Sequence, residues 1–282
     1  MKRIALPTDF SDNSWNAIFC ALKMFESQPC HFVMINAYEV GSLHMARPVS
    51  TRVAGTLHDS AKKLSHEGLK KMLTYFDDTY RNEGHSFEVV SKNNSVVDAL
   101  EEVVVEKGID LIIMGTNGAT GAKGVFMGSN AVKVLKNIRS CPVLVVPSGF
   151  EFKQLKRLVF PTDFTHFYNR TELLPMLYLA ERNHTTLHIF HVAQTIGLSE
   201  EQEYNRATLK KHFKGHAYEF HKVDIQNTVS NAIKDFSKAI HADMMVLVHY
   251  KHTFLEKITQ EPVVKKVAFS AEVPLLVLPE LE

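Results

Sequence analysis

The chain has 282 residues, of which 45% are hydrophobic and 22% charged, and its formal net charge is +1. This length favours two domains over one, and the near-zero charge excludes a polyanion such as nucleic acid as an expected partner. No apolar run approaches the roughly 18 residues that span a bilayer, and the first residues lack the apolar length of a signal peptide, so we expect neither a membrane protein nor an exported one.

Three cysteines, Cys20, Cys30 and Cys141, lie among apolar residues. Their odd number, without the paired spacing of a metal or redox motif, favours buried thiols over a disulfide framework. Buried thiols are typical of a reducing compartment, so we expect a cytoplasmic location.

The chain also contains an internal repeat. Residues 3–10, with the sequence RIALPTDF, recur at 157–164 as RLVFPTDF, so that Asp9 corresponds to Asp163. Two later pairs of segments follow in the same order: 108–115 with 241–248, and 141–147 with 273–279. The repeat predicts a duplicated domain.

Each half, residues 1–150 and residues 151–282, is therefore predicted to be one domain. Within each half, short strands rich in Val, Ile, Leu and Met alternate with helical patterns. This alternation indicates a parallel sheet with helices on both faces, so the predicted fold class is α/β with two tandem open sheets.

In the first half, the first strand ends at Pro7 and Ser11 is the expected cap of the helix that follows. The apolar residues of this helix recur at helical spacing: Trp15, Ile18, Phe19, Leu22 and Phe25. Next come a predicted strand at 31–38, an exposed loop at about 40–55 and a long helix at about 60–81.

A later helix is predicted to begin at Ser95, where Asp98 stands at capping-box spacing, and to end at Gly108. Its inward positions are Val96, Val97, Leu100 and Val104.

The strand at 111–114 leads into a glycine-rich loop, and a new helix begins near Ala131. The glycines of this loop are Gly115, Gly118, Gly121, Gly124 and Gly128. Glycine lets main-chain N–H groups approach phosphate oxygens, a helix N-terminus attracts them, and Ser129 and Asn130 add side-chain donors. The loop matches neither the Walker pattern nor the dinucleotide fingerprint. Lys123 in the loop either neutralises phosphate charge or is simply solvated.

Asp9 follows the first strand. Ligands of open α/β sheets bind outside the carboxyl ends of the strands, where this carboxylate can accept hydrogen bonds from an adenine amino group or a ribose hydroxyl. A role as a helix cap or turn residue is the alternative.

The spacing of Gly115, Gly118, Gly128 and Ser129 resembles the G-x2-G-x9-G-S/T motif of the universal stress protein family. The Pro-Thr-Asp-Phe segment that ends at Phe10 and the Pro-Val-Leu-Val-Val-Pro segment at 142–147 are similar to that family as well. The resemblance covers nearly the whole chain as two tandem copies, and it is strong in the first copy and partial in the second.

The resemblance implies a five-stranded parallel sheet of order 3-2-1-4-5 in each domain, as in the adenine nucleotide alpha hydrolase-like fold. It also implies that the two domains pair through their last strands. It assigns the adenosine contact to Asp9, the adenine pocket to Ala37 and Met114, and ribose and phosphate contacts to the motif glycines. The full implied nucleotide site is Thr8, Asp9, Ala37, Met114, Gly115, Gly118, Gly128, Ser129 and Asn130.

The second copy departs from this pattern at the phosphate loop. After residues 246–248 the chain has no glycine at any motif position, and Glu256 and Glu261 would place negative charge beside a phosphate. We therefore expect a degenerate domain at 151–282. Pro175, inside its first helical pattern, predicts a late helix start or a kink.

The histidines do not predict a metal site. His249 with His252 and His216 with His221 are the pairs that invite one, but neither has the spacing of a known metal motif. Catalytic residues are not predicted either, because the loop supplies chiefly neutral donors, whereas phosphoryl transfer uses a positioned base and a cation.

The sequence thus predicts a cytoplasmic tandem stress-response protein whose first domain binds ATP, AMP or ADP, with Mg²⁺ as a candidate companion ion. Nucleotide binding would make it a sensor or regulator acting on an unknown protein partner. The alternatives are an interaction scaffold that binds no nucleotide and a slow ATPase. A homodimer is a further expectation, and contact with nucleic acid or a membrane is not expected.

Overall fold

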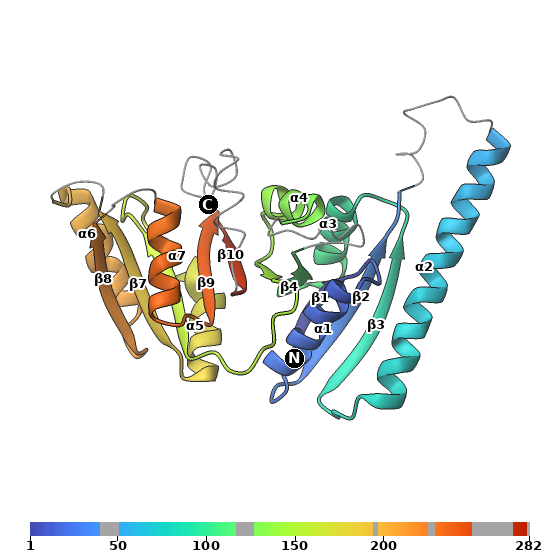
Figure 1. Ribbon diagram of the computed structural model, residues 1–282, viewed down its shortest axis with the longest axis horizontal. Helices are drawn as coiled ribbons and strands as arrows, with labels where there is room; N and C mark the ends of the chain where they lie inside the picture. Colours follow the sequence, from blue (N-terminus) through green and yellow to red (C-terminus); the bar gives the residue numbers. More distant parts are fainter. Residues whose placement is uncertain (40–50, 117–126, 194–196, 225–228, 250–272, 281–282) are drawn as a thin grey trace. The chain divides into compact units, whose positions relative to one another are not determined.

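The computed structural model places two compact units along the chain, Met1–Ala122 with Gly128–Glu151, and Phe152–Glu282 (Figure 1). It describes residues 1–39, 51–116, 127–193, 197–224, 229–249 and 273–280.

The first unit alternates strands and helices without exception along its described residues. Its elements are β1 (Lys2–Pro7), α1 (Asp12–Met24), β2 (Cys30–Ala37), α2 (Thr51–Thr79), β3 (His85–Lys92), α3 (Val96–Lys107), β4 (Leu111–Gly115), α4 (Ser129–Asn137) and β5 (Val143–Val146). The strands are parallel and lie in the order β3-β2-β1-β4-β5. This is the predicted 3-2-1-4-5 order, with β1 in the centre.

The helices cover both faces of this sheet, as predicted (Figure 1). The ring of Trp15 in α1 lies 5.4 Å from that of Tyr75 and 5.7 Å from that of Phe76, both in α2. Helix α3 packs against α4. Crossovers between parallel strands are right-handed. Helices α1 and α2, which lead from β1 through β2 to β3, therefore lie on one face of the sheet, and α3 and α4, which lead from β3 through β4 to β5, lie on the other.

The second unit repeats this architecture. Its elements are β6 (Arg157–Thr162), α5 (Arg170–Asn183), β7 (Thr186–Ala193), α6 (Glu200–His212), β8 (Tyr218–Asp224), α7 (Val229–Ala239), β9 (Met244–His249) and β10 (Leu275–Pro279). Their order, β10-β9-β6-β7-β8, again corresponds to 3-2-1-4-5. Helix α5 starts seven residues after Asp163, whereas α1 starts three residues after Asp9, so the start is late as predicted; Pro175 itself lies inside α5 and not at its first position.

The predicted helix boundaries are confirmed where capping residues marked them. Ser11 caps α1, and its side chain accepts a hydrogen bond from the N–H of Ser14. Ser95 caps α3 in the same way, through the N–H of Asp98, and Gly108 ends that helix with a positive φ of 60°. These boundaries depend on local hydrogen bonds, which a sequence pattern records directly.

Two expectations were wrong in part. The long helix begins at Thr51 rather than near residue 60. Gly55 lies inside it, because a glycine within a helix lowers helix stability by only about 1 kcal/mol relative to alanine. Residues 40–50 of the expected loop lie outside the described residues. Phe19 is 45% exposed and does not belong to the buried face of α1. Its ring lies 5.7 Å from Trp15 and 6.3 Å from Tyr75, on the α2 side of the helix.

All three cysteines are buried and free, as the sequence predicts. Burial raises the pKa of the Cys141 thiol to about 12 and that of Cys30 to about 11. Both thiols therefore stay protonated near neutral pH, and a protonated, buried thiol is a poor nucleophile.

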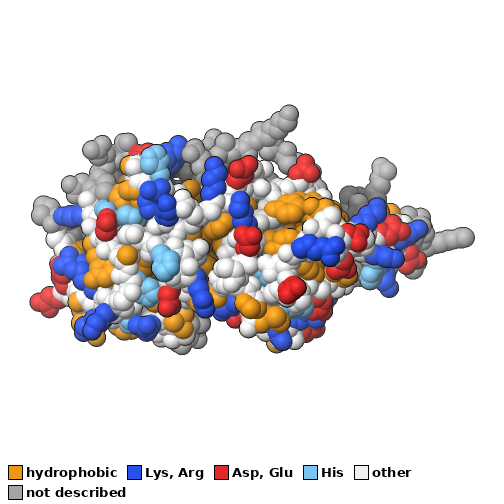
Figure 2. Space-filling view, turned by 90° about the horizontal axis from the view of Figure 1, so that it is seen from below, with side chains coloured by type: hydrophobic (Ala, Val, Ile, Leu, Met, Phe, Trp, Pro, Cys, Tyr) orange, Lys and Arg blue, Asp and Glu red, His pale blue; other side chains and the backbone are white. Residues whose placement is uncertain are grey.

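Charged side chains of both signs are mixed over the face of the molecule drawn in Figure 2. This mixture accords with the net charge of +1. Among the described helices, none is both long enough and apolar enough to cross a membrane.

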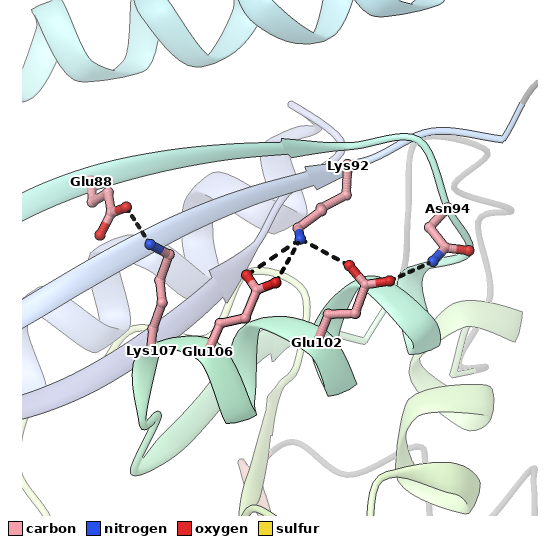
Figure 3. Close-up of polar contacts among 6 residues, drawn as sticks. All are labelled: Glu88, Lys92, Asn94, Glu102, Glu106 and Lys107. Atoms are coloured by element: carbon pink, nitrogen blue, oxygen red, sulfur yellow. Dashed lines mark hydrogen bonds and ion pairs between the residues drawn. The ribbon is translucent and has the colours of Figure 1, made fainter.

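Ion pairs tie α3 to β3 along their exposed sides (Figure 3). Lys107 Nζ lies 2.6 Å from Glu88 Oε1, and Lys92 Nζ lies 2.8 Å from Glu102 Oε2 and 3.3 Å from Glu106 Oε2. The hydrogen bond from Lys107 is the main cause that lowers the pKa of Glu88 below its ordinary value of 4.5.

A second contact sets the distance between α1 and β4. A Cβ atom at Gly115 would lie 2.8 Å from both the side-chain Cγ and the main-chain oxygen of Asn13. Carbon and oxygen atoms do not approach this closely without a bond, so the start of α1 reaches β4 only because residue 115 has no side chain. In the second unit Val248 stands at the corresponding position, and the later start of α5 accompanies it.

The Glu88 ion pair gives a pH-dependent prediction. Replacing Glu88 by Gln is expected to lower the free energy of unfolding at pH 7 by only about 0.5 kcal/mol, because its side chain is 38% exposed. Since the folded state lowers the pKa of Glu88, this contribution exists above pH 4.5 and is lost as the pH falls through the folded-state pKa. Urea titrations at pH 7 and at pH 3, followed by the fluorescence of Trp15, measure it.

The matched control for that series is Glu101→Gln, which removes the same charge from an exposed position of α3. An equal loss in both variants, or a Glu88→Gln loss that does not decrease as the pH is lowered from 7 to 3, would contradict the assignment to the ion pair.

The Asn13 contact predicts that Gly115→Ala lowers the free energy of unfolding by about 2 kcal/mol, since overpacking of a close contact has this magnitude. Trp15 is the single tryptophan of the chain and lies in α1, so urea unfolding followed by its fluorescence reports on this unit. In an Asn13→Ala background the loss should shrink but not vanish, because the main-chain oxygen remains. A loss that does not depend on residue 13 would show that another contact is responsible.

Candidate functional site

A cavity of about 300 Å³ opens at the carboxyl ends of β1 and β4. These neighbouring strands are the point where the strand order reverses, because the chain proceeds from β1 to β2 on one side and from β4 to β5 on the other. Open α/β sheets bind ligands at such a point. The structure brings together eight of the nine residues predicted from the sequence: Thr8, Asp9, Ala37, Met114, Gly115, Gly128, Ser129 and Asn130. The ninth, Gly118, lies outside the described residues.

A tight turn holds Asp9 at the edge of this cavity. Its Oδ1 accepts hydrogen bonds from the N–H of Ser11 at 3.1 Å and from the hydroxyl of Ser11 at 2.6 Å. Phe10, between them, has a φ of 64°, a conformation that residues other than glycine rarely adopt. The carboxylate therefore has a defined position, and it takes the turn role that the sequence left as the alternative.

The second unit has the same turn. Asp163 Oδ1 accepts hydrogen bonds from the N–H and the hydroxyl of Thr165, at 3.0 and 2.7 Å, and the φ of Phe164 is 60°. The repeated Thr-Asp-Phe segment is thus explained by local backbone geometry in both copies. A ligand contact through Asp9 is a further role that remains a prediction.

Thr8 takes part in the turn more than in the cavity surface. Its hydroxyl accepts a hydrogen bond from the N–H of Phe10 at 3.0 Å and shares another of 2.9 Å with the hydroxyl of Ser14. The main-chain oxygen of Thr8 accepts a hydrogen bond of 2.7 Å from the side chain of Asn36. Thr8 therefore links β1, β2 and α1 and fixes the position from which Asp9 extends.

One part of the cavity wall is apolar. It is formed by Pro7, Ile35, Ala37, Val96 and Met114. The side chains of Ile35 and Met114 are buried, and Ala37 ends β2 with a small side chain. An apolar wall beside fixed polar groups is the usual composition of a small-molecule site, and a planar base would contact such a wall favourably.

The start of α4 contributes a polar part of the wall. Gly128 caps this helix in an extended conformation, with φ −62° and ψ 155°, and the first turn contains no acidic residue. The first N–H groups of a helix have no acceptor within the helix and carry partial positive charge. The N–H of Gly128 donates to the oxygen of Thr116 at 2.6 Å, which joins the two sides of the glycine loop. This arrangement can hold an anion.

Gly115 has a second, structural role beside its place in the cavity wall. The resemblance assigned it to close contact with ribose and phosphate, and it does line the cavity. The absence of its side chain is, however, already required by Asn13 of α1.

Sequence reasoning missed Ser14 and Asn36, which position the turn. Asn36 had a detectable signal, because it is a polar residue inside the otherwise apolar run at 32–37. In the second unit His191 stands at the same register position, and its Nδ1 lies 3.1 Å from the oxygen of Thr162. The predicted loss of the phosphate loop after His249 falls on residues outside the described ones and stays a prediction.

Comparison with known proteins agrees with this geometry. The family model described as "Universal stress protein family" matches residues 1–147. Universal stress protein MJ0531 of Methanocaldococcus jannaschii is 32% identical over 148 residues, which cover 51% of this chain and 81% of that protein. Universal stress protein MJ0577 of the same organism is 32% identical over 162 residues, covering 51% of this chain and 94% of that protein.

Solved structures show the same fold over the whole length. The crystal structure of a universal stress protein from Archaeoglobus fulgidus DSM 4304 has a TM-score of 0.65 at 16% identity and covers 99% of this chain and 96% of its own. A functionally unknown protein, PA1789 from Pseudomonas aeruginosa PAO1, has a TM-score of 0.60 at 16% identity, with 99% and 92% covered. With the family model matching more than half of the residues, the chain belongs to the universal stress protein family.

Proposed function

We propose that the first half of this protein binds ATP or a related adenine nucleotide in the cavity between β1 and β4, and that binding rather than turnover is its function. The observation that carries the proposal is that one cavity is lined both by a group of apolar side chains and by the first residues of α4. The motif spacing of Gly115, Gly118, Gly128 and Ser129 and membership of the universal stress protein family support it.

The apolar wall suits the adenine base. Ala37 and Met114 lie at the ends of β2 and β4, on either side of β1, and a flat ring between them would contact carbon atoms of both. A cavity of about 300 Å³ is at the lower end of the range for small-molecule sites, which start at about 300 Å³. Asp9, held by Ser11, would accept hydrogen bonds from the ribose hydroxyls.

The start of α4 suits the phosphates. Ser129 and Asn130 line the cavity, and N–H groups of a helix N-terminus are donors that an anion can use without any lysine or arginine. The first turn of α4 contains no acidic residue that would repel a phosphate.

The side chains of the lining favour binding over hydrolysis. Among the described lining residues, Asp9 is the one carboxylate, and none is a lysine, arginine or histidine. Efficient phosphoryl transfer uses a positioned base and cations that stabilise the developing charge. A Mg²⁺ ion bound with the nucleotide would take ligands chiefly from the phosphates and water, with Asp9 as the protein ligand within the described lining.

In this proposal the protein acts in the stress response as a nucleotide-dependent sensor or regulator. The second half serves as a structural or partner-binding domain without nucleotide. Cytoplasmic location, pairing of the two halves through their last strands, homodimerisation and the unknown protein partner stay predictions.

The proposal predicts that one ATP binds per chain in calorimetric titration and that Gly128→Asp weakens binding about 10-fold or more, since a charge 4–5 Å from a phosphate costs about 1–4 kcal/mol near a protein surface. Gly128 has ordinary helix-cap dihedral angles, so a side chain there introduces no backbone strain. Aspartate is a good helix cap and should not lower the stability of α4.

The matched control is Gly128→Asn, which has the same shape, caps equally well and carries no charge. It should bind ATP within a few-fold of the parent, and both variants should unfold at the same urea concentration. Absence of binding by the parent, or an equal loss in both variants, would defeat the proposal in favour of a scaffold without nucleotide. Two ATP molecules per chain would refute the assignment of the second half.

A further inference from the structure

Three side chains of the second unit converge on one face of its sheet. His188 lies on β7, and Glu219 and His221 lie on β8. The register pairs His188 directly with Glu219, and Phe190 with His221. Because side chains two residues apart on a strand share a face, all three lie on the same side. Among the described residues, they form a group whose nitrogen and oxygen ligand atoms all lie within 4.8 Å of one another.

The distances within this group match those of a bound tetrahedral ion. His188 Nδ1 lies 3.0 Å from His221 Nε2 and 3.6 Å from Glu219 Oε2, and His221 Nε2 lies 3.5 Å from Glu219 Oε2. Zinc binds nitrogen and oxygen ligands at 2.0–2.2 Å in tetrahedral sites, which places neighbouring ligand atoms about 3.3 Å apart. The three side chains therefore present one face of such a tetrahedron without a large movement.

The fold itself does not require histidine at two of these positions. The repeated segments align Pro7 with Pro161. Pro7 pairs with Ile35 in the first unit and Pro161 pairs with Phe190 in the second, so Ile35 and Phe190 are corresponding positions. By this register, the positions of His188, Glu219 and His221 are occupied in the first unit by Val33, Glu88 and Val90. Since Val33 is fully buried there, the two histidines are additions of the second unit and not a need of the architecture.

Neighbouring rings pack against the histidines of this group, and its glutamate side is exposed to solvent. His188 is 8% exposed, whereas the side chain of Glu219 is 60% exposed, so that the group opens to solvent on one side. The ring of His221 lies 4.8 Å from that of Phe236 in α7, which stacks on Phe190 at 4.4 Å.

Burial is the main cause that lowers the pKa of His188, with His221 and Arg157 acting in the same direction and Glu219 against it.

We propose that His188, Glu219 and His221 bind one divalent transition-metal ion, with Zn²⁺ as the best match, and that water completes its coordination on the exposed side. Two imidazole nitrogens and one carboxylate form a donor set that zinc accepts, whereas Mg²⁺ and Ca²⁺ prefer oxygen ligands. Bound metal would join β7 to β8, the strand at the end of the order in this unit. His221 is close in sequence to His216, but in the structure its partner is His188.

The test is a competition titration of the full-length, tag-free, metal-stripped protein with ZnCl2 against a chromophoric chelator. The unmodified protein should bind one Zn²⁺ per chain, more tightly than any of the ligand variants below. Glu219→Gln, at an exposed position, should weaken that binding at least about 10-fold, and the double variant His188→Val, His221→Val should abolish it. The valines are those that the first unit uses at the same positions, so this variant should fold.

Two further measurements keep the outcome clear. His184→Asn removes an exposed histidine of the same unit whose φ of 51° asparagine also adopts, and it should bind zinc as the parent does. Co²⁺ bound to the parent should give the visible absorption of a four-coordinate ion, and the double valine variant should not. Equal zinc affinity in the parent and the double valine variant, or no binding by the parent, would overturn the proposal and leave a hydrogen-bonded cluster only.

Discussion

The central position of β1, in parallel pairing with both β2 and β4, is the constraint on which the rest of this structure depends. It sends the two neighbouring crossovers in opposite directions and leaves the carboxyl ends of β1 and β4 open between them. The contact between Asn13 and Gly115 then sets how closely α1 approaches β4. Together these features fix the geometry of the cavity before any ligand group is considered.

The two halves show how one architecture can carry different sites. Both keep the Thr-Asp-Phe turn with its positive φ and the same carboxylate hydrogen bonds, because the turn joins the central strand to the segment that follows it. The first unit alone has a glycine, Gly115, at the end of β4 and an early start of α1. The second unit has Val248 and a late helix at the corresponding places, and it has two histidines where the first has valines. The two units therefore share one arrangement of strands and helices and differ in the side chains at its edges.

Features set by contacts within a few residues agree with the sequence prediction, whereas features set by packing between elements do not. Ser11, Ser95 and Gly108 marked helix ends correctly, because a cap is a contact within a few residues. Phe19 shares the helical spacing of the apolar residues of α1 and is nevertheless exposed, because which part of such a stripe is buried depends on how α1 and α2 pack. For the same reason, the true start of α2 was not visible in a segment without a clear hydrophobic period.

The sequence by itself determined the duplication, the α/β class, the strand order through family resemblance, and eight residues that come to line one cavity. The repeat and the class follow from repeated segments and from strand and helix periodicity, which act over short stretches of chain, whereas the strand order and the full set of cavity residues are what the family resemblance implies. Only the tertiary structure decided that Asn13 meets Gly115 and that His188 meets His221, which stand 102 and 33 residues apart. Such meetings depend on strand register and helix packing, and these are set by burying the whole sheet at once rather than by any local pattern.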